Sequence, residues 1–258
     1  MDADKVSGFF AIVFVTVGVL CWPLSSIAQS GVAIGSSTVK AEAGIVASRG
    51  NSDNESANVK FETAREWIRW KLGFGAAAVY AADDTGATGQ RWNARTQADY
   101  RFHRQGFSFA GARYEEDRFG GFEYQSSLST GLGWRFFDDP VTRLSAQLGV
   151  GYGRVRTRDS LAEDAVTPIP GELNEKIVEQ ASVEFERMLT PNTQLADKLL
   201  IESGADNTFV QNDISVQVKI MAELALAVGY SVRYNTDPPA GFNTTDTLST
   251  LNFSYEFK

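Results

Sequence analysis

Hydrophobic and polar residues alternate along most of the chain after residue 39. From Arg91 to Arg101 every second residue is charged or carries an amide, whereas the residues between them, from Trp92 to Phe102, are aromatic, small or uncharged. A period of two residues sends successive side chains to opposite faces of a β-strand, whereas a helix repeats every ~3.6 residues. Such a segment therefore predicts a strand with one hydrophilic and one hydrophobic face.

Segments of this kind fill the chain up to its C-terminal end. We place twelve expected strands at residues 40–49, 55–66, 68–81, 90–103, 106–117, 122–137, 141–156, 174–189, 193–203, 208–220, 223–235 and 246–257. A tilted strand needs about 9 to 11 residues to cross a hydrocarbon layer, and these segments are long enough. Short connections between these segments alternate with longer ones, and 157–173 and 236–245 are examples of the longer ones. An even strand number with short periplasmic turns predicts an all-β fold, a single antiparallel transmembrane β-barrel.

Aromatic residues distinguish this barrel from a soluble one, which has the same period with its apolar face turned inward. Tryptophan and tyrosine favour the membrane–water interface, so a membrane-spanning wall carries aromatic residues near both ends of its strands. We predict an aromatic girdle formed by Trp92, Tyr100, Phe102, Tyr124, Trp134, Phe136, Tyr230, Tyr234, Tyr255 and Phe257. This placement favours the membrane, with a lipocalin-like soluble barrel as the alternative.

The opposite faces of the same strands carry charged residues of both signs. We predict that the following side chains line a pore: Glu62, Arg69, Lys71, Arg91, Arg95, Asp99, Arg101, Arg135, Glu184, Lys198, Glu202, Asp213, Lys219 and Arg233. Barrels of about eight strands are filled by side chains, whereas those of about 16 strands or more leave open channels. Long side chains of opposite charge can pair across a bore of intermediate size, so we expect a narrow or occluded pore.

The first residues of the chain have a different pattern. Lys5 precedes an apolar run at 6–20, and small residues at Ser26 and Ala28 suit a signal peptidase. Cys21 follows Leu20 and not the small residue of a lipoprotein site, so we predict no lipid anchor. The expected parts are a signal peptide (1–28), a short periplasmic segment (29–39) and the outer-membrane barrel (40–258). An uncleaved membrane anchor is the alternative for the first part.

Composition excludes several function classes. Acidic residues outnumber basic ones by 32 to 24, with a net charge of −8, which argues against nucleic-acid binding. The chain has one cysteine and one histidine, too few for a zinc site or the usual hydrolytic residue set. We expect His103 to lie in a solvated periplasmic turn. The sequence thus predicts no catalytic residues, no metal site and no cofactor.

Two further motifs have a structural interpretation. Glu115 and Glu116 are adjacent in a strand and point to opposite faces, so they cannot share one acid–base or cation site. Carboxylates at 115–117 and 163–164 that bridge to lipopolysaccharide through calcium or magnesium are the minority interpretation. The glycines at 149–153 lack the Lys-Ser/Thr of a phosphate loop, and we expect them to relieve crowding or permit bending in a curved wall.

Several short motifs resemble one known family. They are Gly50-Asn51-Ser52-Asp53 with Ser56, Arg113–Phe119 followed by Gly121–Tyr124, Gly149–Tyr152, and Tyr234–Gly241 leading to Thr245–Thr247. In their order and spacing they resemble the salt-induced outer-membrane proteins, a β-barrel family of unknown function. Tyr255-Glu256-Phe257 also resembles the terminal signature that the outer-membrane assembly machinery reads. The resemblance implies an outer-membrane location and a single barrel, and it implies no reaction.

These observations predict an exported protein of the Gram-negative outer membrane that is not an enzyme. We expect a narrow pore or an envelope-support protein linked to salt or osmotic stress. The expected partners are outer-membrane lipid, lipopolysaccharide and, during biogenesis, the assembly machinery. A barrel enzyme acting on lipid or peptide, and a non-conducting structural or binding barrel, remain the alternatives.

Overall fold

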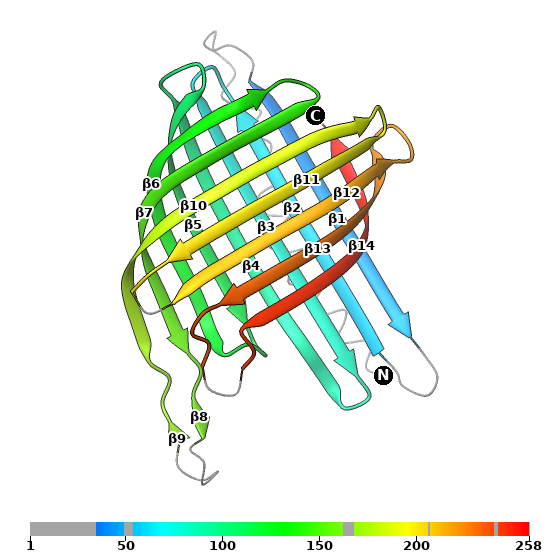
Figure 1. Cartoon of the computed structure of the whole chain (residues 1–258). Helices are drawn as coiled ribbons and strands as arrows, with labels where there is room; N and C mark the ends of the chain where they lie inside the picture. The colour runs from blue at the N-terminus through cyan, green and yellow to red at the C-terminus, as the bar shows by residue number, and fades with distance from the viewer. Residues whose placement is uncertain (1–34, 49–53, 162–167, 206, 240–241, 258) are drawn as a thin grey trace, which may run out of the picture. The chain divides into compact units, whose positions relative to one another are not determined.

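The described part of the chain forms a closed antiparallel barrel of twelve strands (Figure 1). The computed structural model describes residues 35–48, 54–161, 168–205, 207–239 and 242–257. The chain divides into two units, 1–34 and 35–258, and the first lies outside the described residues. The predicted signal peptide and most of the predicted periplasmic segment fall there, and both stay predictions. Among the described residues, no helix is long and apolar enough to cross a membrane.

All twelve predicted strands are confirmed. The barrel strands are β1 (Ser36–Ser48), β2 (Asn54–Glu66), β3 (Trp70–Asp83), β4 (Gly86–Arg101), β5 (Gly106–Asp117), β6 (Phe122–Asp138), β7 (Thr142–Thr157), β10 (Leu173–Thr190), β11 (Thr193–Ser203), β12 (Thr208–Lys219), β13 (Leu224–Asn235) and β14 (Thr245–Phe257). Two differences stand out. β1 begins at Ser36, so part of the segment predicted at 29–39 is strand, and the predicted loop 157–173 contains a short hairpin of β8 (Ser160–Leu161) and β9 (Pro168–Ile169).

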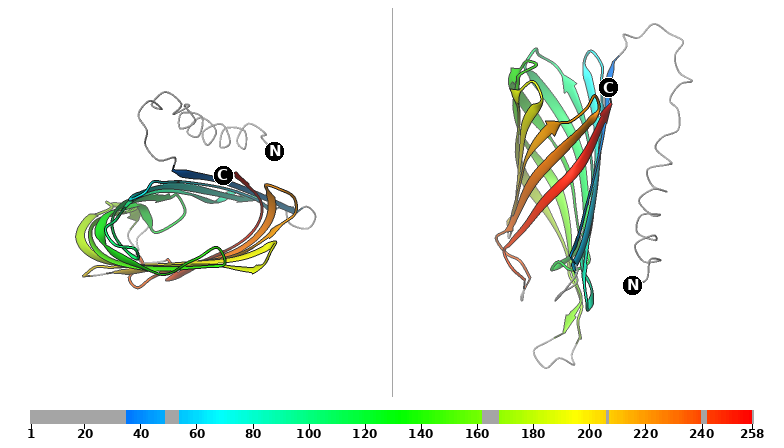
Figure 2. Two further views of the ribbon diagram at one scale, coloured as in Figure 1. Left: turned by 90° about the horizontal axis from the view of Figure 1, so that it is seen from above. Right: turned by 90° about the vertical axis from the view of Figure 1, so that its right-hand side faces the viewer.

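The barrel strands follow one another around a flattened ring (Figure 2), with β1 and β14 closing it. In this order β5 and β13 are six strands apart in both directions, so they lie on opposite walls. The closing ladder is short. β1 pairs with β2 over thirteen residues but with β14 only from Val39 to Ala43, and beyond this the two strands diverge (Figure 2).

The hydrophobic faces of the strands point away from the barrel. Leu148 on β7 is 70% exposed and Ile177 on β10 is 76% exposed, whereas Asp99, Glu115 and Arg233 are buried in the interior. This is the reverse of a soluble barrel, which hides its large apolar side chains inside. The predicted direction of the two faces is therefore confirmed.

Glycines on β6 and β7 make room for interior aromatic rings on β5. Phe107 and Phe109 are buried. A Cβ atom on Gly133 would lie 2.1 Å from the Cζ atom of Phe107, and one on Gly149 would lie 2.8 Å from that of Phe109. Gly149 also approaches the carbonyl oxygen of Thr130, where a Cβ would lie at 2.4 Å. These contacts agree with the predicted role of the 149–153 glycines in relieving crowding.

Candidate functional site in the barrel interior

Most of the predicted pore-lining side chains lie on the interior face. The pairing registers place there Glu62, Lys71, Arg91, Arg95, Asp99, Arg101, Arg135, Glu184, Lys198, Glu202, Asp213 and Arg233. Lys219 shares this face but ends β12 and is exposed. Their function as the lining of a pore stays a prediction.

The prediction for Arg69 is wrong. Arg69 lies in the exposed turn between β2 and β3, and its guanidinium donates a hydrogen bond to the hydroxyl of Tyr100 (3.3 Å), a residue of the outward face. The physical reason is that the strand begins at Trp70 and not at residue 68, so the alternation does not extend to Arg69.

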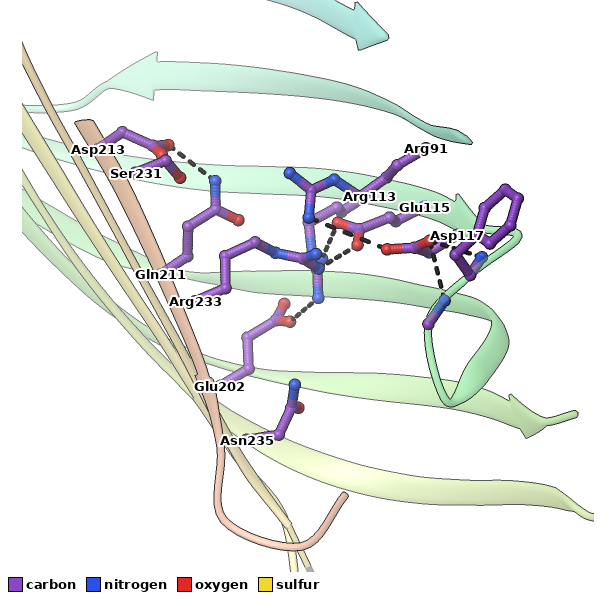
Figure 3. Close-up of polar contacts among 12 residues, drawn as sticks. Arg91, Arg113, Glu115, Asp117, Glu202, Gln211, Asp213, Ser231, Arg233 and Asn235 are labelled. Atoms are coloured by element: carbon purple, nitrogen blue, oxygen red, sulfur yellow. Dashed lines mark hydrogen bonds and ion pairs between the residues drawn. The ribbon is translucent and has the colours of Figure 1, made fainter. Parts of the chain in front are cut away.

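Four charged side chains, all buried except the partly exposed Arg113, meet inside the barrel and form what we call the interior ion-pair cluster: Arg113, Glu115, Glu202 and Arg233 (Figure 3). Arg233 Nη2 pairs with Glu115 Oε1, and Arg113 Nη2 donates to Glu202 Oε2 at 2.5 Å. Arg113 also reaches Glu115 Oε2 at 3.4 Å. The side chains of Arg233 and Glu115 are only 8% and 6% exposed. Because an isolated buried charge is strongly unfavourable, their mutual pairing is what permits this burial.

The surroundings of the cluster fix its geometry. The ring of Phe209 on β12 lies 4.7 Å from the guanidinium carbon of Arg113 and 5.3 Å from that of Arg233, within the range of cation–π contacts. The hydroxyl of Ser127 on β6 donates to Glu202 Oε1 at 2.7 Å. Both guanidiniums and the carboxylate of Glu202 therefore have a defined partner besides their ion pairs, and Glu115 is held by two guanidiniums.

The cluster joins strands that are far apart in the ring. Glu115 is on β5 and Arg233 on β13, so this pair bridges opposite walls. A second bridge lies elsewhere in the interior, where Glu62 on β2 accepts hydrogen bonds from Arg95 (2.5 Å) and from Lys198 on β11 (3.3 Å). β2 and β11 are five strands apart. Side chains thus connect the walls of the barrel at more than one place.

Two connections meet at the end of the barrel that carries the longer loops, which we call the loop end. A Cβ atom on Gly121, between β5 and β6, would lie 2.9 Å from atoms of both Pro239 and Phe242, between β13 and β14. Arg158 Nη2 donates to the carbonyl oxygen of Asp117 at 2.6 Å. Since β5 and β13 are on opposite walls, the approach of Gly121 to Pro239 and Phe242 crosses the opening. The bond from Arg158, which follows β7, instead joins strands two apart in one wall.

Sequence reasoning identified Glu202 and Arg233 but missed Arg113, Glu115 and Phe209 as interior partners. The prediction that Glu115 and Glu116 point apart is confirmed, because Glu116 accepts a hydrogen bond on the outer wall from Trp92 Nε1 (3.3 Å). The same alternation placed Arg113 on the face of Glu115, so the signal for Arg113 was present. No such signal was present for Phe209, since an apolar residue is expected to face outward.

The predicted aromatic girdle lies on the outer wall, with one correction. Rings gather near the strand ends, where Trp70 packs on Tyr100 (centroids 5.0 Å apart) and Tyr114 stacks on Tyr124 (5.9 Å). The exposed members of the predicted set include Trp92, Phe102, Trp134, Phe136, Tyr234, Tyr255 and Phe257. Tyr230 is also exposed but lies near the middle of β13, because alternation defines the face of a residue and not its height.

His103 lies in the turn between β4 and β5, as predicted. Its ring stacks on that of Trp134 with centroids 5.7 Å apart, and its Nδ1 accepts a hydrogen bond from the amide of Gln105 at 3.4 Å. Within the described ranges, no three His, Cys, Asp or Glu residues come together as metal ligands would.

A closed barrel with an apolar exterior and a paired, charged interior is the architecture of outer-membrane β-barrel proteins. The chain belongs to the family described as "Protein of unknown function, DUF481", which matches residues 41–257. It is similar to the uncharacterized protein YdiY of Escherichia coli K12, with 24% identity over 218 residues that cover 83% of this chain and 80% of that protein.

Solved structures share the barrel at low sequence identity. The translocator domain of the autotransporter NalP from Neisseria meningitidis is 9% identical, with a TM-score of 0.50 and coverage of 99% of this chain and 98% of that domain. An outer membrane channel from Pseudomonas putida F1 is 10% identical, with a TM-score of 0.48 and coverage of 91% and 100%. The NalP likeness shows the fold alone.

Proposed function

We propose that this protein is an integral barrel of the Gram-negative outer membrane whose interior is a narrow passage for ions or small solutes, and that it catalyses no reaction. The observation that carries the proposal is the contact between Glu115 and Arg233, which joins opposite walls. Export by a signal peptide at 1–28 is part of the proposal.

The outer wall supports the membrane location. Its exposed apolar side chains, such as Leu128 (63%) and Leu148 (70%), would be unfavourable in water and suit acyl chains. Every barrel strand has at least eleven residues, enough to cross the hydrocarbon. Outer-membrane lipid and lipopolysaccharide are then the partners of this wall, and the outward-facing Tyr255 and Phe257 are available to the assembly machinery.

The interior supports a passage that is narrow and weakly charge-selective. Charged side chains of both signs line the interior and form ion pairs across it. A solute therefore passes only where these pairs separate and exchange partners. Dissolved salt weakens ion pairs that water reaches, such as Arg95 with Glu62, whose side chains are 43% and 23% exposed. It acts less on the buried pair of Glu115 and Arg233. We therefore propose that the passage opens more readily at high ionic strength, which would give the salt link implied by the family resemblance a physical basis.

Conductance in planar bilayers tests this function. The Glu115→Ala/Arg233→Ala double variant should give larger single-channel steps than the unmodified protein, because the bridge across the bore is gone. The matched control is Glu123→Ala/Arg156→Ala, which removes an ion pair (2.8 Å) whose side chains are 47% and 42% exposed, with Arg156 on the outer wall, and should leave the steps unchanged. Silence of all three proteins in every salt would reject a passage.

A non-conducting structural or binding barrel is the second candidate. The contact of Gly121 with Pro239 and Phe242 across the loop end favours it, because loops that cover an opening also present a surface. Removing this contact by shortening the 236–244 loop distinguishes the two candidates. Larger or more frequent steps in the shortened protein support a passage, whereas continued silence supports the structural barrel.

A further inference from the structure

A polar pair lies in the middle of the apolar outer wall. Asn212 Nδ2 on β12 donates a hydrogen bond to Asp197 Oδ1 on β11 at 2.7 Å. The neighbouring Lys198 points into the barrel, where it pairs with Glu62, so the alternation of the strand sends Asp197 outward. A carboxylate and a carboxamide thus share the face that otherwise carries apolar side chains.

The position along the strands places this pair within the apolar belt. Asp197 is the fifth residue of β11, and its same-face neighbours are Leu195 and Leu199. Asn212 is likewise flanked on its own face by Val210 and Ile214. β11 has only 11 residues, about the minimum needed to cross the hydrocarbon. The middle of this strand therefore lies well away from both membrane surfaces.

Tyr230 extends the polar group to the next strand. It lies near the middle of β13, pairs in register with Ile214, and is 46% exposed. β11, β12 and β13 are neighbours in one wall (Figure 1). The same mid-wall region thus presents a carboxylate, a carboxamide and a phenol hydroxyl.

Acyl chains offer no hydrogen-bond partners to these groups. Within the described part of the chain, the bond between Asn212 and Asp197 is the only one that either side chain makes. It leaves the second carboxylate oxygen of Asp197 and the second amide hydrogen of Asn212 without a partner. Polar residues in such positions serve in membrane proteins as contacts between neighbouring elements.

We propose that this face of β11, β12 and β13 is covered in the membrane by the same face of a second copy of the chain. The face is self-complementary, since it holds both an acceptor on Asp197 and a donor on Asn212. A twofold axis along the membrane normal, between the two faces, brings Asn212 of each copy to Asp197 of the other. The second carboxylate oxygen and the second amide hydrogen then both gain a partner. This inference rests on the proposed membrane location.

Cysteine cross-linking in outer-membrane fractions tests the interface. The chain has a single cysteine, Cys21, so variants in a Cys21→Ser background carry one thiol. Ile214→Cys lies beside the polar pair, whereas the control Leu128→Cys lies on β6 at a more exposed site (63% against 39%). Mild oxidation should give a disulfide-linked dimer with Ile214→Cys and only monomer with Leu128→Cys.

A second variant connects the dimer to the polar pair. Asp197→Leu/Asn212→Leu combined with Ile214→Cys should reduce the dimer band several-fold while the barrel still fractionates with the outer membrane. No dimer with Ile214→Cys, equal dimer at both thiol positions, or an undiminished band in the leucine variant would each overturn the interface while leaving the proposed passage intact. Recovery of the chain in the soluble fraction would instead overturn the proposed location and this inference with it.

Discussion

Glu115 and Arg233 allow a test in which the two halves of one ion pair should behave differently. Glu115→Ala leaves the guanidinium of Arg233 beside the ring of Phe209, with no other carboxylate of the described residues within ion-pair distance. Arg233→Ala leaves Glu115 with a second cation, because Arg113 Nη1 lies 3.4 Å from Glu115 Oε2. The structure therefore predicts that losing the carboxylate destabilises the barrel more than losing the guanidinium.

Burial determines the size of the effect. Both side chains are less than a tenth exposed, so Glu115→Ala falls in the class of broken buried pairs, which lose about 3–5 kcal/mol. Arg233→Ala removes a charged hydrogen bond but leaves its partner paired, which corresponds to about 1.5–3 kcal/mol. The double variant removes both charges, so its loss should be smaller than the sum by about 1–3 kcal/mol.

The measurement is the free energy of unfolding in urea, with the barrel in lipid vesicles and tryptophan fluorescence as the signal. The four proteins of the double-mutant cycle give both single effects and their coupling. Equal losses for the two single variants would refute the assignment of Arg113 as the second partner of Glu115. A double variant whose loss equals the sum of the single losses would refute the coupling between Glu115 and Arg233.

Three further predictions concern packing, selectivity and pH. Gly133→Ala should destabilise the barrel by about 1–3 kcal/mol, because its methyl group would overlap the ring of Phe107, and urea unfolding measures the loss. If the passage conducts, Arg95→Ala should shift ion selectivity toward cations and Asp99→Ala toward anions, as read from reversal potentials in a salt gradient. Backbone amides that donate to the Asp139 carboxylate lower its pKa, so its contribution to stability should be present above the ordinary carboxyl pKa and be lost as the pH falls through the lowered value.

Matched controls accompany two of these predictions. Gly73→Ala also adds an interior methyl group, but its nearest contact is an ordinary 3.9 Å, so it should be tolerated; equal damage at both glycines would contradict the packing argument. The amides of Thr142 and Val141 are the donors to Asp139, each at 2.8 Å. Asp139→Asn should therefore flatten the acid limb of the stability curve, and an unchanged limb would contradict the assignment.

The strands and their faces were predictable because alternation is a local property. Both ends of β5 and β11 were predicted correctly, since tight turns bound these strands on one side. The start of β1 was not, because Ser36, Ser37 and Thr38 carry no contrast between polar and apolar faces. Arg69 was misplaced for a related reason, since a turn interrupts the two-residue period just before Trp70.

The partners within the interior were much less predictable. Alternation shows that Glu115 and Arg233 face inward, but not that β5 and β13 lie opposite each other at a matching height. Phe107, Phe109 and Phe209 contradict the simple rule that apolar residues face outward, because the interior of this barrel also needs packing volume. The height of Tyr230 required the register between strands, which no single strand reveals.

The brevity of the ladder between the first and last strands has a consequence for handling the protein. Five facing residues hold that junction, against thirteen on the other edge of β1. In a bilayer, separating β1 from β14 would expose unpaired backbone N–H and C=O groups to the hydrocarbon. The surrounding lipid therefore favours the closed barrel. In water or a harsh detergent this constraint is absent, and we expect the purified barrel to open between β1 and β14 before any other pair of strands separates.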